Sequence, residues 1–262
     1  MKKLLLLVLL ILIGCSKDDG LHTRYYLGGD KEERTFKNNV IEGPYVYYFS
    51  DGDREEGTYK NGVKEGPVVY YSNGDREEGT YKNDVQEGPF VTYFSGEFEG
   101  DREEGTYKNG VIEGPYVYYF SDGDREEGTY KNGVKEGPVV NYLSGEFEGD
   151  REEGTYKNGV REGPVVYYYH SRGFEGDREE GTYKNGVQEG PYVYYFSDGD
   201  RQEGTYKNNV KEGPFVTYFS GEFEGDREEG TYKNNVKEGP VVYYFSDGDR
   251  QEGTFKNGVR SF

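Results

Sequence analysis

The sequence predicts an all-β protein, an elongated solenoid-like antiparallel β-meander of stacked hairpins. A unit of 22 to 27 residues recurs from near residue 30 to the last residue, and the tripeptide Glu-Gly-Pro occurs in it at nine places. Each unit has an Asn-Gly pair, or a close variant, between two stretches rich in Tyr, Val and Thr. Such a period is typical of stacked supersecondary units, which bury apolar surface only between neighbours. The expected role of such an array is binding or spacing.

The N-terminal residues are distinct from the array. Two lysines precede an apolar run, Leu4 to Ile13, which is shorter than the roughly 20 residues of a membrane-spanning helix. The run is typical of a signal peptide. Because the only cysteine, Cys15, follows Leu-Ile-Gly, the segment resembles a bacterial lipoprotein signal that is cut before Cys15. We expect residues 1–14 to be this signal and 15–29 to be a lipid-carrying tether, with an ordinary secretory signal as the alternative.

The charge of the chain bears on its partners and location. A formal net charge of −19 repels polyphosphates and anionic lipid surfaces within about 8–10 Å at physiological salt. We therefore expect no nucleic-acid partner, and we expect membrane attachment through acyl chains on Cys15. Ser16 after that cysteine resembles outer-membrane sorting in Gram-negative cells. The expected location is the bacterial cell envelope, and in a Gram-negative cell the outer membrane or the cell surface.

One unit, Asp53 to Gly74, illustrates the predicted hairpin. An extended stretch from Arg54 to Lys60 is followed by Asn61-Gly62, and the extended pattern then resumes. Asn-Gly favours the left-handed backbone of a two-residue hairpin turn. Other units have Asn-Asn or Asn-Asp at this place, and these residues also tolerate positive φ. Backbone geometry, rather than a ligand, therefore explains these positions.

The strand after each proline alternates with a period of two. Its second residue is always Val and its fourth is always Tyr, whereas the third varies among Tyr, Thr and Asn. We interpret the uniform face as structural and the varying face as more solvent-facing. The varying face is then the candidate for partner recognition. Its tyrosines are Tyr47, Tyr70, Tyr118, Tyr167, Tyr194 and Tyr243.

Four of the links between units are longer than the others and carry a phenylalanine followed by Glu-Gly. These candidate partner-binding residues are Phe98, Phe147, Phe174 and Phe223. Each ring could fold back over the neighbouring repeat. Alternatively, the loops could project aromatic anchors with an acidic rim toward a partner.

The stretch from Glu56 to Gly66 resembles a MORN repeat, a hairpin unit with the pattern Tyr-Glu-Gly-x-aromatic-x-Asn-Gly-x-x-x-Gly. The resemblance extends over residues 30–262 as about nine to ten repeats. Glu55 replaces the leading Tyr of the pattern, and Val68 replaces the second Gly of its closing Gly-x-Gly. The chain is more similar to a bacterial variant whose members are often labelled antitoxin-like. This resemblance implies stacked hairpins along one axis and transfers no catalytic residue.

Catalysis and cofactors find little support in the sequence. His22 and His170 have no sequence-visible catalytic partner, and no nucleophile elbow, phosphate loop or metal-spaced His and Cys cluster occurs. Calcium is the one cofactor worth weighing, because carboxylates lie beside turns at Asp51, Asp53 and residues 101–104. Their spacing lacks the EF-hand pattern. We expect no enzyme activity, no cofactor and no metal site.

The sequence therefore predicts a lipid-anchored, non-enzymatic repeat protein of the bacterial envelope that acts as a scaffold and binds another protein. The resemblance also implies an alternative, an antitoxin-like or immunity-like neutralising protein. A passive surface spacer is the third possibility.

Overall fold

A computed structural model describes residues 18–261, and these divide into two compact units, one ending at Val85 and the other beginning at Gln86. The described residues contain 29 strands and three short 3-10 helices, and every strand pairing is antiparallel. The predicted all-β meander is therefore confirmed. Within residues 18–261 no helix is long and apolar enough to cross a membrane. The predicted signal peptide and Cys15 lie outside the described residues.

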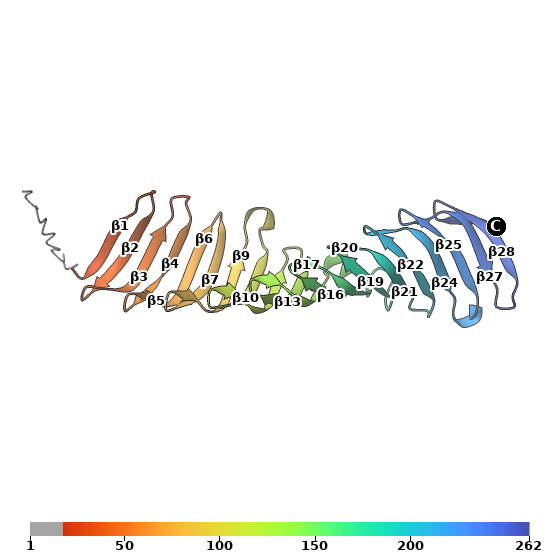
Figure 1. The fold of residues 1–262 in the computed structure, drawn as a ribbon, viewed down its shortest axis with the longest axis horizontal. Coiled ribbons are helices and arrows are strands. Elements are labelled where there is room, and N and C mark those ends of the chain that lie inside the picture. Colours follow the sequence, from red (N-terminus) through yellow and green to blue (C-terminus); the bar gives the residue numbers. More distant parts are fainter. Residues whose placement is uncertain (1–17, 262) are drawn as a thin grey trace, which may run out of the picture. The chain divides into compact units, whose positions relative to one another are not determined.

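The first unit is a run of hairpins formed by residues 20–82 (Figure 1). Its strands are β1 (Gly20–Tyr25), β2 (Lys31–Lys37), β3 (Val40–Tyr48), β4 (Arg54–Lys60), β5 (Val63–Lys64), β6 (Gly66–Ser72) and β7 (Asp75–Lys82), and β8 (Val85–Gln86) lies at the boundary.

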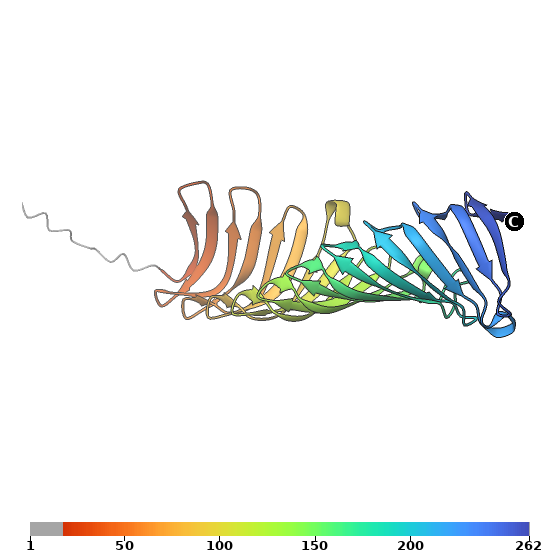
Figure 2. The same ribbon diagram turned by 45° about the vertical axis from the view of Figure 1, so that its right-hand side comes forward.

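The second unit repeats the same hairpin in a single layer of strands, which Figure 2 shows from a second direction. Its elements are β9 (Gly88–Tyr93), η1 (Gly96–Phe98), β10 (Arg102–Lys108), β11 (Val111–Ile112), β12 (Gly114–Tyr119), β13 (Arg125–Lys131), β14 (Val134–Lys135), β15 (Gly137–Tyr142), η2 (Gly145–Phe147), β16 (Arg151–Lys157), β17 (Val160–Arg161), β18 (Gly163–Tyr168), β19 (Arg178–Lys184), β20 (Val187–Gln188), β21 (Gly190–Tyr195), β22 (Arg201–Lys207), β23 (Val210–Lys211), β24 (Gly213–Tyr218), η3 (Gly221–Phe223), β25 (Arg227–Lys233), β26 (Val236–Lys237), β27 (Gly239–Tyr244), β28 (Arg250–Lys256) and β29 (Val259–Ser261).

The start of the array differs from the sequence prediction. Residues 20–25, which we expected to belong to the tether, form β1 and pair with β2 from Gly20↔Phe36 to Tyr25↔Lys31. Arg34 stands where other units have glycine, is 8% exposed and forms an ion pair with Glu32 at 3.0 Å. The first repeat of the array therefore has a different buried layer from the repeats that follow it.

The hairpin turns have the predicted backbone. Asn132 and Gly133 have φ values of 51° and 77°, and the Asn-Asn pair at Asn208 and Asn209 has values of 50° and 66°. Asparagine is among the non-glycine residues that adopt this left-handed region most readily. The substitutions between repeats thus follow the turn geometry.

The glutamate of each Glu-Gly-Pro motif joins its repeat to the next repeat by a hydrogen bond. Glu113 Oε2, for example, accepts a hydrogen bond at 2.7 Å from the backbone N–H of Asn132 in the following turn. At the opposite edge, Asp226 Oδ1 accepts from the backbone N–H of Ser246, also at 2.7 Å. The carboxylates beside the turns therefore accept hydrogen bonds from backbone N–H groups of the neighbouring hairpin. Without these carboxylates, the same N–H groups would have to bind water.

The packing corrects our interpretation of the two strand faces. The first residue after each proline shares a face with the varying third residue, and it is the most buried position of each repeat. Tyr116, for example, is 2% exposed and lies opposite Gly128 on the neighbouring strand. A Cβ at Gly128 would lie 2.7 Å from the Tyr116 ring, so glycine makes room for the ring. We call this face, defined by the first, third and fifth residues after proline, the aromatic face.

Charged side chains cover much of the uniform Val and Tyr face. Arg125 forms an ion pair with Glu127 at 3.0 Å and places its guanidinium 4.3 Å from the ring centroid of Tyr142. Val117, which pairs with Glu127 on the neighbouring strand, is only partly buried. The uniform face is therefore a polar, half-exposed surface, and the varying face contains the buried layer.

Candidate functional site

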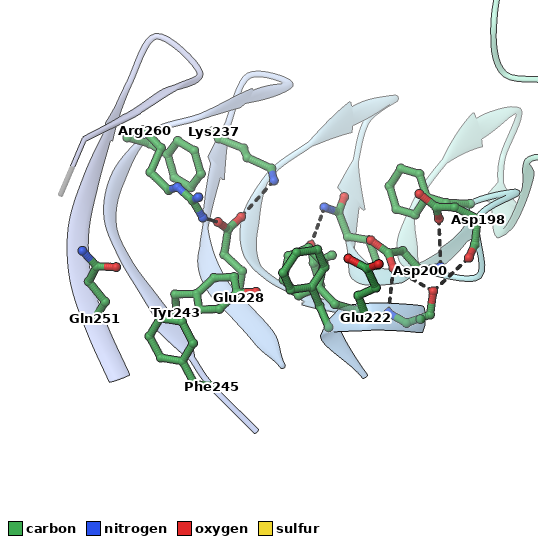
Figure 3. Close-up of a pocket in the computed structure, with 17 residues that line it drawn as sticks. Asp198, Asp200, Glu222, Glu228, Lys237, Tyr243, Phe245, Gln251 and Arg260 are labelled. Carbon is green, nitrogen blue, oxygen red and sulfur yellow. Dashed lines mark hydrogen bonds and ion pairs between the residues drawn. The ribbon is translucent and has the colours of Figure 1, made fainter. Parts of the chain in front are cut away.

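The aromatic face of the second unit contains a groove of about 870 Å³ near its C-terminal end, and Figure 3 shows the side chains that line it. We call it the C-terminal groove. Its aromatic lining residues are Phe196, Phe219, Phe223, Tyr243, Phe245 and Phe255, and its charged ones are Asp198, Asp200, Glu222, Glu228, Lys237 and Arg260. The groove thus combines the lining of a hydrophobic pocket with charges of both signs.

Tyr243 on β27 lies in the aromatic row of this groove. Its ring centroid is 5.3 Å from that of Phe219 and 4.9 Å from that of Phe245. Its hydroxyl donates a hydrogen bond to Asp226 Oδ2 at 2.7 Å. Burial and this hydrogen bond raise the pKa of Tyr243 to about 12. The hydroxyl is therefore held in its neutral form, and the ring has a fixed orientation.

Phe223 reaches the same groove from the loop that contains η3. The backbone N–H of Phe223 donates to the carbonyl of Ser220 at 3.1 Å, and the N–H of Ser220 donates to Asp200 Oδ1 at 2.8 Å. These bonds fix the backbone of the loop, whereas the residue Phe223 is 59% exposed. Of the two alternatives drawn from the sequence, this exposure favours a projecting ring over one folded onto the neighbouring repeat.

Buried charge lies at the base of the groove. Glu228 is 4% exposed, and it accepts hydrogen bonds from Lys237 Nζ at 3.1 Å and from Arg260 Nη1 at 2.6 Å (Figure 3). Gln202 is 5% exposed and occupies the place that glutamate has in most units. It accepts from the hydroxyl of Tyr192 at 3.0 Å. Glu228 and Gln202 therefore both have hydrogen-bond partners, as burial of a polar side chain requires.

A second groove of about 500 Å³ brings together two more of the predicted residues, Phe174 and Tyr194. Tyr194 donates its hydroxyl hydrogen to Asp177 Oδ2 at 2.6 Å. The two grooves share Phe196, Gln202 and Lys237 as lining residues, so they adjoin along the aromatic face.

The remaining predicted tyrosines lie on the aromatic face of either unit and make hydrogen bonds within it. In the second unit, Tyr118 donates to Asp101 at 2.7 Å, and the hydroxyl of Tyr167 lies 2.8 Å from that of Tyr183. In the first unit, the acceptors of the tyrosine hydroxyls are Asp30 for Tyr47, at 2.8 Å, and Asp53 for Tyr70, at 2.7 Å. Each of these four tyrosine hydroxyls therefore has a hydrogen-bond partner within the array.

The two other loop phenylalanines differ in exposure. Phe98 is 58% exposed and Phe147 is 39% exposed. The guanidinium carbon of Arg172 lies 3.8 Å from the ring centroid of Phe147. The Phe147 ring is therefore partly covered by a cation from the next unit.

Some lining residues were missed in the sequence analysis. Phe196, Phe219 and Phe245 are the fifth residues after their prolines, one step beyond the third residue on the same face. Extending the period of two by that step would have found them. The change from Glu to Gln at Gln202 is also visible in the repeats, but only the structure connects it with the groove.

No group of three or more His, Cys, Asp or Glu side chains within residues 18–261 is arranged to hold a metal ion. Asp101 and Asp53, which we weighed as calcium ligands, accept hydrogen bonds from tyrosine hydroxyls instead. His170 is exposed, and its backbone N–H donates to Asp150 at 2.7 Å.

Comparison with protein families identifies the repeat. The MORN repeat matches seven segments that together cover more than half of the chain, namely residues 35–54, 56–76, 104–125, 127–138, 153–173, 180–201 and 229–250. The chain belongs to the MORN repeat family. Residues between the matched MORN segments, such as β9 and β24, form the same strands. The structure thus extends the MORN hairpin to units that the sequence match leaves out.

The other comparisons add little to the MORN assignment. No curated protein matches the chain. Among solved structures, the chain is similar to the TCP domain of SAS-4 (dCPAP) from Drosophila melanogaster, solved in complex with a proline-rich motif of Ana2 (dSTIL). The identity is 10%, the TM-score is 0.27, and the match covers 88% of each chain.

Proposed function

We propose that this MORN-repeat protein is a non-enzymatic scaffold that binds another protein through the aromatic face of residues 86–261. The observation that carries the proposal is the C-terminal groove of about 870 Å³, to which Phe223 and Tyr243 both contribute. Phe223 comes from a loop and is exposed, so it is available to a partner. Tyr243 comes from a strand, and its hydrogen bond to Asp226 fixes its ring in the lining of the groove. In this proposal, Phe174 and Tyr194 have the same roles in the second groove.

The chemistry of the groove suits protein recognition. Aromatic side chains dominate the energetics of protein interfaces when they fill pockets from which water is excluded. The tyrosine rings are already held by hydrogen bonds, as with Tyr243 and Asp226 at 2.7 Å, so little side-chain entropy is lost when a partner binds. The repeated hairpins supply such rings at regular intervals, which suits an extended partner segment.

The proposal places this scaffold in the bacterial envelope through lipid on Cys15. Its support is the sequence alone, an apolar run followed by Leu-Ile-Gly-Cys. Two or more acyl chains hold a protein at a membrane far more firmly than one. Metabolic labelling with a palmitate analogue is expected to label the wild-type chain and to leave Cys15→Ser unlabelled. Equal labelling of the two would remove the anchor from the proposal.

Affinity capture with matched variants tests the binding role. One variant changes the four loop phenylalanines, Phe98, Phe147, Phe174 and Phe223, to serine. The control changes four valines at the hairpin turns, which are 41–44% exposed, to serine: Val111, Val134, Val160 and Val236. We expect envelope or host extracts to yield a protein that wild type and the control retain and the phenylalanine variant loses. If all three chains retain the same proteins, or none, the scaffold proposal is wrong and the spacer gains support.

A further inference from the structure

Three loops of the second unit share the sequence Ser-Gly-Glu-Phe-Glu-Gly and the same fold. They span residues 95–100, 144–149 and 220–225, and each contains one of the helices η1, η2 and η3. In each loop, the glycine before the first glutamate has a φ of 59–63°. The phenylalanine rings nevertheless differ, since Phe98 and Phe223 are 58% and 59% exposed and Phe147 is 39% exposed.

A single side chain explains this difference. The guanidinium carbon of Arg172 lies 3.8 Å from the centroid of the Phe147 ring, which is stacking distance for a cation over an aromatic face. Arg172 itself has a φ of 58°, a left-handed conformation that a residue with a long side chain rarely adopts. The chain thus shows, within its own fold, which group binds to this type of loop.

Among residues 18–261, no cation lies over the Phe98 or Phe223 ring as Arg172 does over Phe147, and the next link is shorter in both cases. In all three cases the last glycine of the loop lies against the following link: a Cβ at Gly149 would be 3.1 Å from His170, and one at Gly225 would be 3.0 Å from Ser246. The link after loop 144–149 is the long one that contains Arg172. The links after loops 95–100 and 220–225 are the short turns 121–124 and 246–249, whose sequence is Ser-Asp-Gly-Asp.

We infer that Phe98 and Phe223 each receive an arginine side chain from the bound partner, in the place that Arg172 takes at Phe147. This inference rests on the proposed scaffold function and names the chemistry of its partner, an arginine-bearing segment of another protein. The planar guanidinium stacks on an aromatic ring better than the compact, strongly hydrated ammonium of lysine.

The charge around the rings fits this partner. Glu97 and Glu99 flank Phe98, and Glu222 and Glu224 flank Phe223. Asp198 and Glu222 also line the C-terminal groove. The whole chain carries a formal charge of −19, so its field attracts basic segments and speeds their association. An arginine at either loop therefore gains both ring stacking and attraction to carboxylates.

Peptide binding to the full-length chain, purified in mild detergent, tests the inference. The probes are two fluorescein-labelled peptides of twelve residues, with four arginines or four lysines separated by Gly-Ser, and the readout is fluorescence anisotropy. We expect the arginine peptide to bind at least threefold more tightly than the lysine peptide. Phe98→Ser and Phe223→Ser are each expected to weaken arginine-peptide binding about threefold, and Phe147→Ser to leave it unchanged. Equal affinities for both peptides, or equal effects of the three substitutions, would overturn the inference.

A variant that gains a binding site distinguishes loss of a ring contact from misfolding of the array. Arg172→Gly uncovers Phe147, and glycine adopts the φ of 58° without strain. Calorimetric titration is expected to show one additional arginine site in this variant and none in Arg172→Gly/Phe147→Ser. An unchanged stoichiometry would count against the inference. If envelope capture succeeds while the peptides ignore these rings, the scaffold function stands and only its arginine specificity is lost.

Discussion

Lys211 donates a hydrogen bond to Glu179 at 2.9 Å, although Lys211 belongs to the hairpin that contains Gln202. In the hairpin that contains Glu55, the lysine, Lys64, bonds instead to the glutamate of its own hairpin, at 2.5 Å. The Glu179 hairpin has Gln188 at the place of Lys64, so it supplies no cation of its own. The next hairpin has the neutral Gln202 at the place of the glutamate, so its Lys211 is available to balance the charge of Glu179. Neighbouring units therefore share their buried charge.

Lys211→Met is expected to lower the free energy of unfolding by about 3 kcal/mol, because it leaves Glu179 without its cation in a buried site. The Glu179 side chain is 3% exposed. Urea unfolding followed by tyrosine fluorescence measures the change. Glu179→Gln/Lys211→Met is expected to recover most of the loss, because it removes the uncompensated charge.

Lys207→Met is the control for this experiment. Lys207 is exposed on β22, and its substitution is expected to change the unfolding free energy by no more than about 0.5 kcal/mol. Equal losses for the Lys211 and Lys207 variants would show that the pair with Glu179 does not stabilise the array.

The hairpins were predictable because local backbone preferences determine them. Asn132 and Gly133 tolerate positive φ, so the sequence alone located the turn and the two strands beside it. The choice of buried face was not predictable in the same way. An alternating strand has two faces, and the deciding feature is the missing side chain at Gly128, which lets Tyr116 pack on the neighbouring strand.

The site was predictable one residue at a time. Phe223 and Tyr243 each stood out in the repeats, but their common groove depends on how the loop with η3 lies against β27. A loop conformation of this kind follows from contacts between units, such as Asp200 with Ser220 at 2.8 Å. These contacts connect residues about 20 positions apart in neighbouring repeats, and the sequence pattern within one repeat does not predict them.

Gly128→Ala is expected to destabilise the array by about 1–3 kcal/mol, because the new methyl group would lie 2.7 Å from the buried Tyr116 ring. Gly181→Ala is the matched control. At that position the nearest atom, on Val165, is 3.6 Å away, so the substitution is expected to be neutral or slightly stabilising. Thermal unfolding of both variants by circular dichroism measures the difference. Similar losses would mean that the ring does not restrict the glycine.

The tyrosine hydroxyls predict how stability depends on alkaline pH. The hydrogen bond to Asp30 raises the pKa of Tyr47 from 10.0 to about 12, and that to Asp53 does the same for Tyr70. A group whose pKa is higher in the folded state contributes stability that is complete below its unfolded value. The contribution of these tyrosines is therefore present below pH 10 and is lost as the pH rises toward 12.

Asp30→Asn tests this assignment, because asparagine keeps an acceptor near Tyr47 and removes the charge. We expect the pKa of Tyr47 to fall toward 10, as measured from its Cζ chemical shift in a ¹³C-tyrosine-labelled chain. Asp51→Asn, which changes a neighbouring carboxylate that accepts from the N–H of Asp53 at 3.2 Å, is expected to leave Tyr47 unchanged. An unaltered Tyr47 titration in Asp30→Asn would contradict the role of the hydrogen bond.

Two phenylalanines of the C-terminal half separate binding from folding. Phe215 is 1% exposed and packs in a buried cluster with Val241 and Phe255, so Phe215→Ala is expected to cost about 3–5 kcal/mol of unfolding free energy. Phe223 is 59% exposed, and Phe223→Ser is expected to change that free energy by no more than about 0.5 kcal/mol. Urea unfolding of both variants checks the contrast. A large loss in Phe223→Ser would show that its ring stabilises the loop, and a loss of binding in that variant would then no longer identify a contact with the partner.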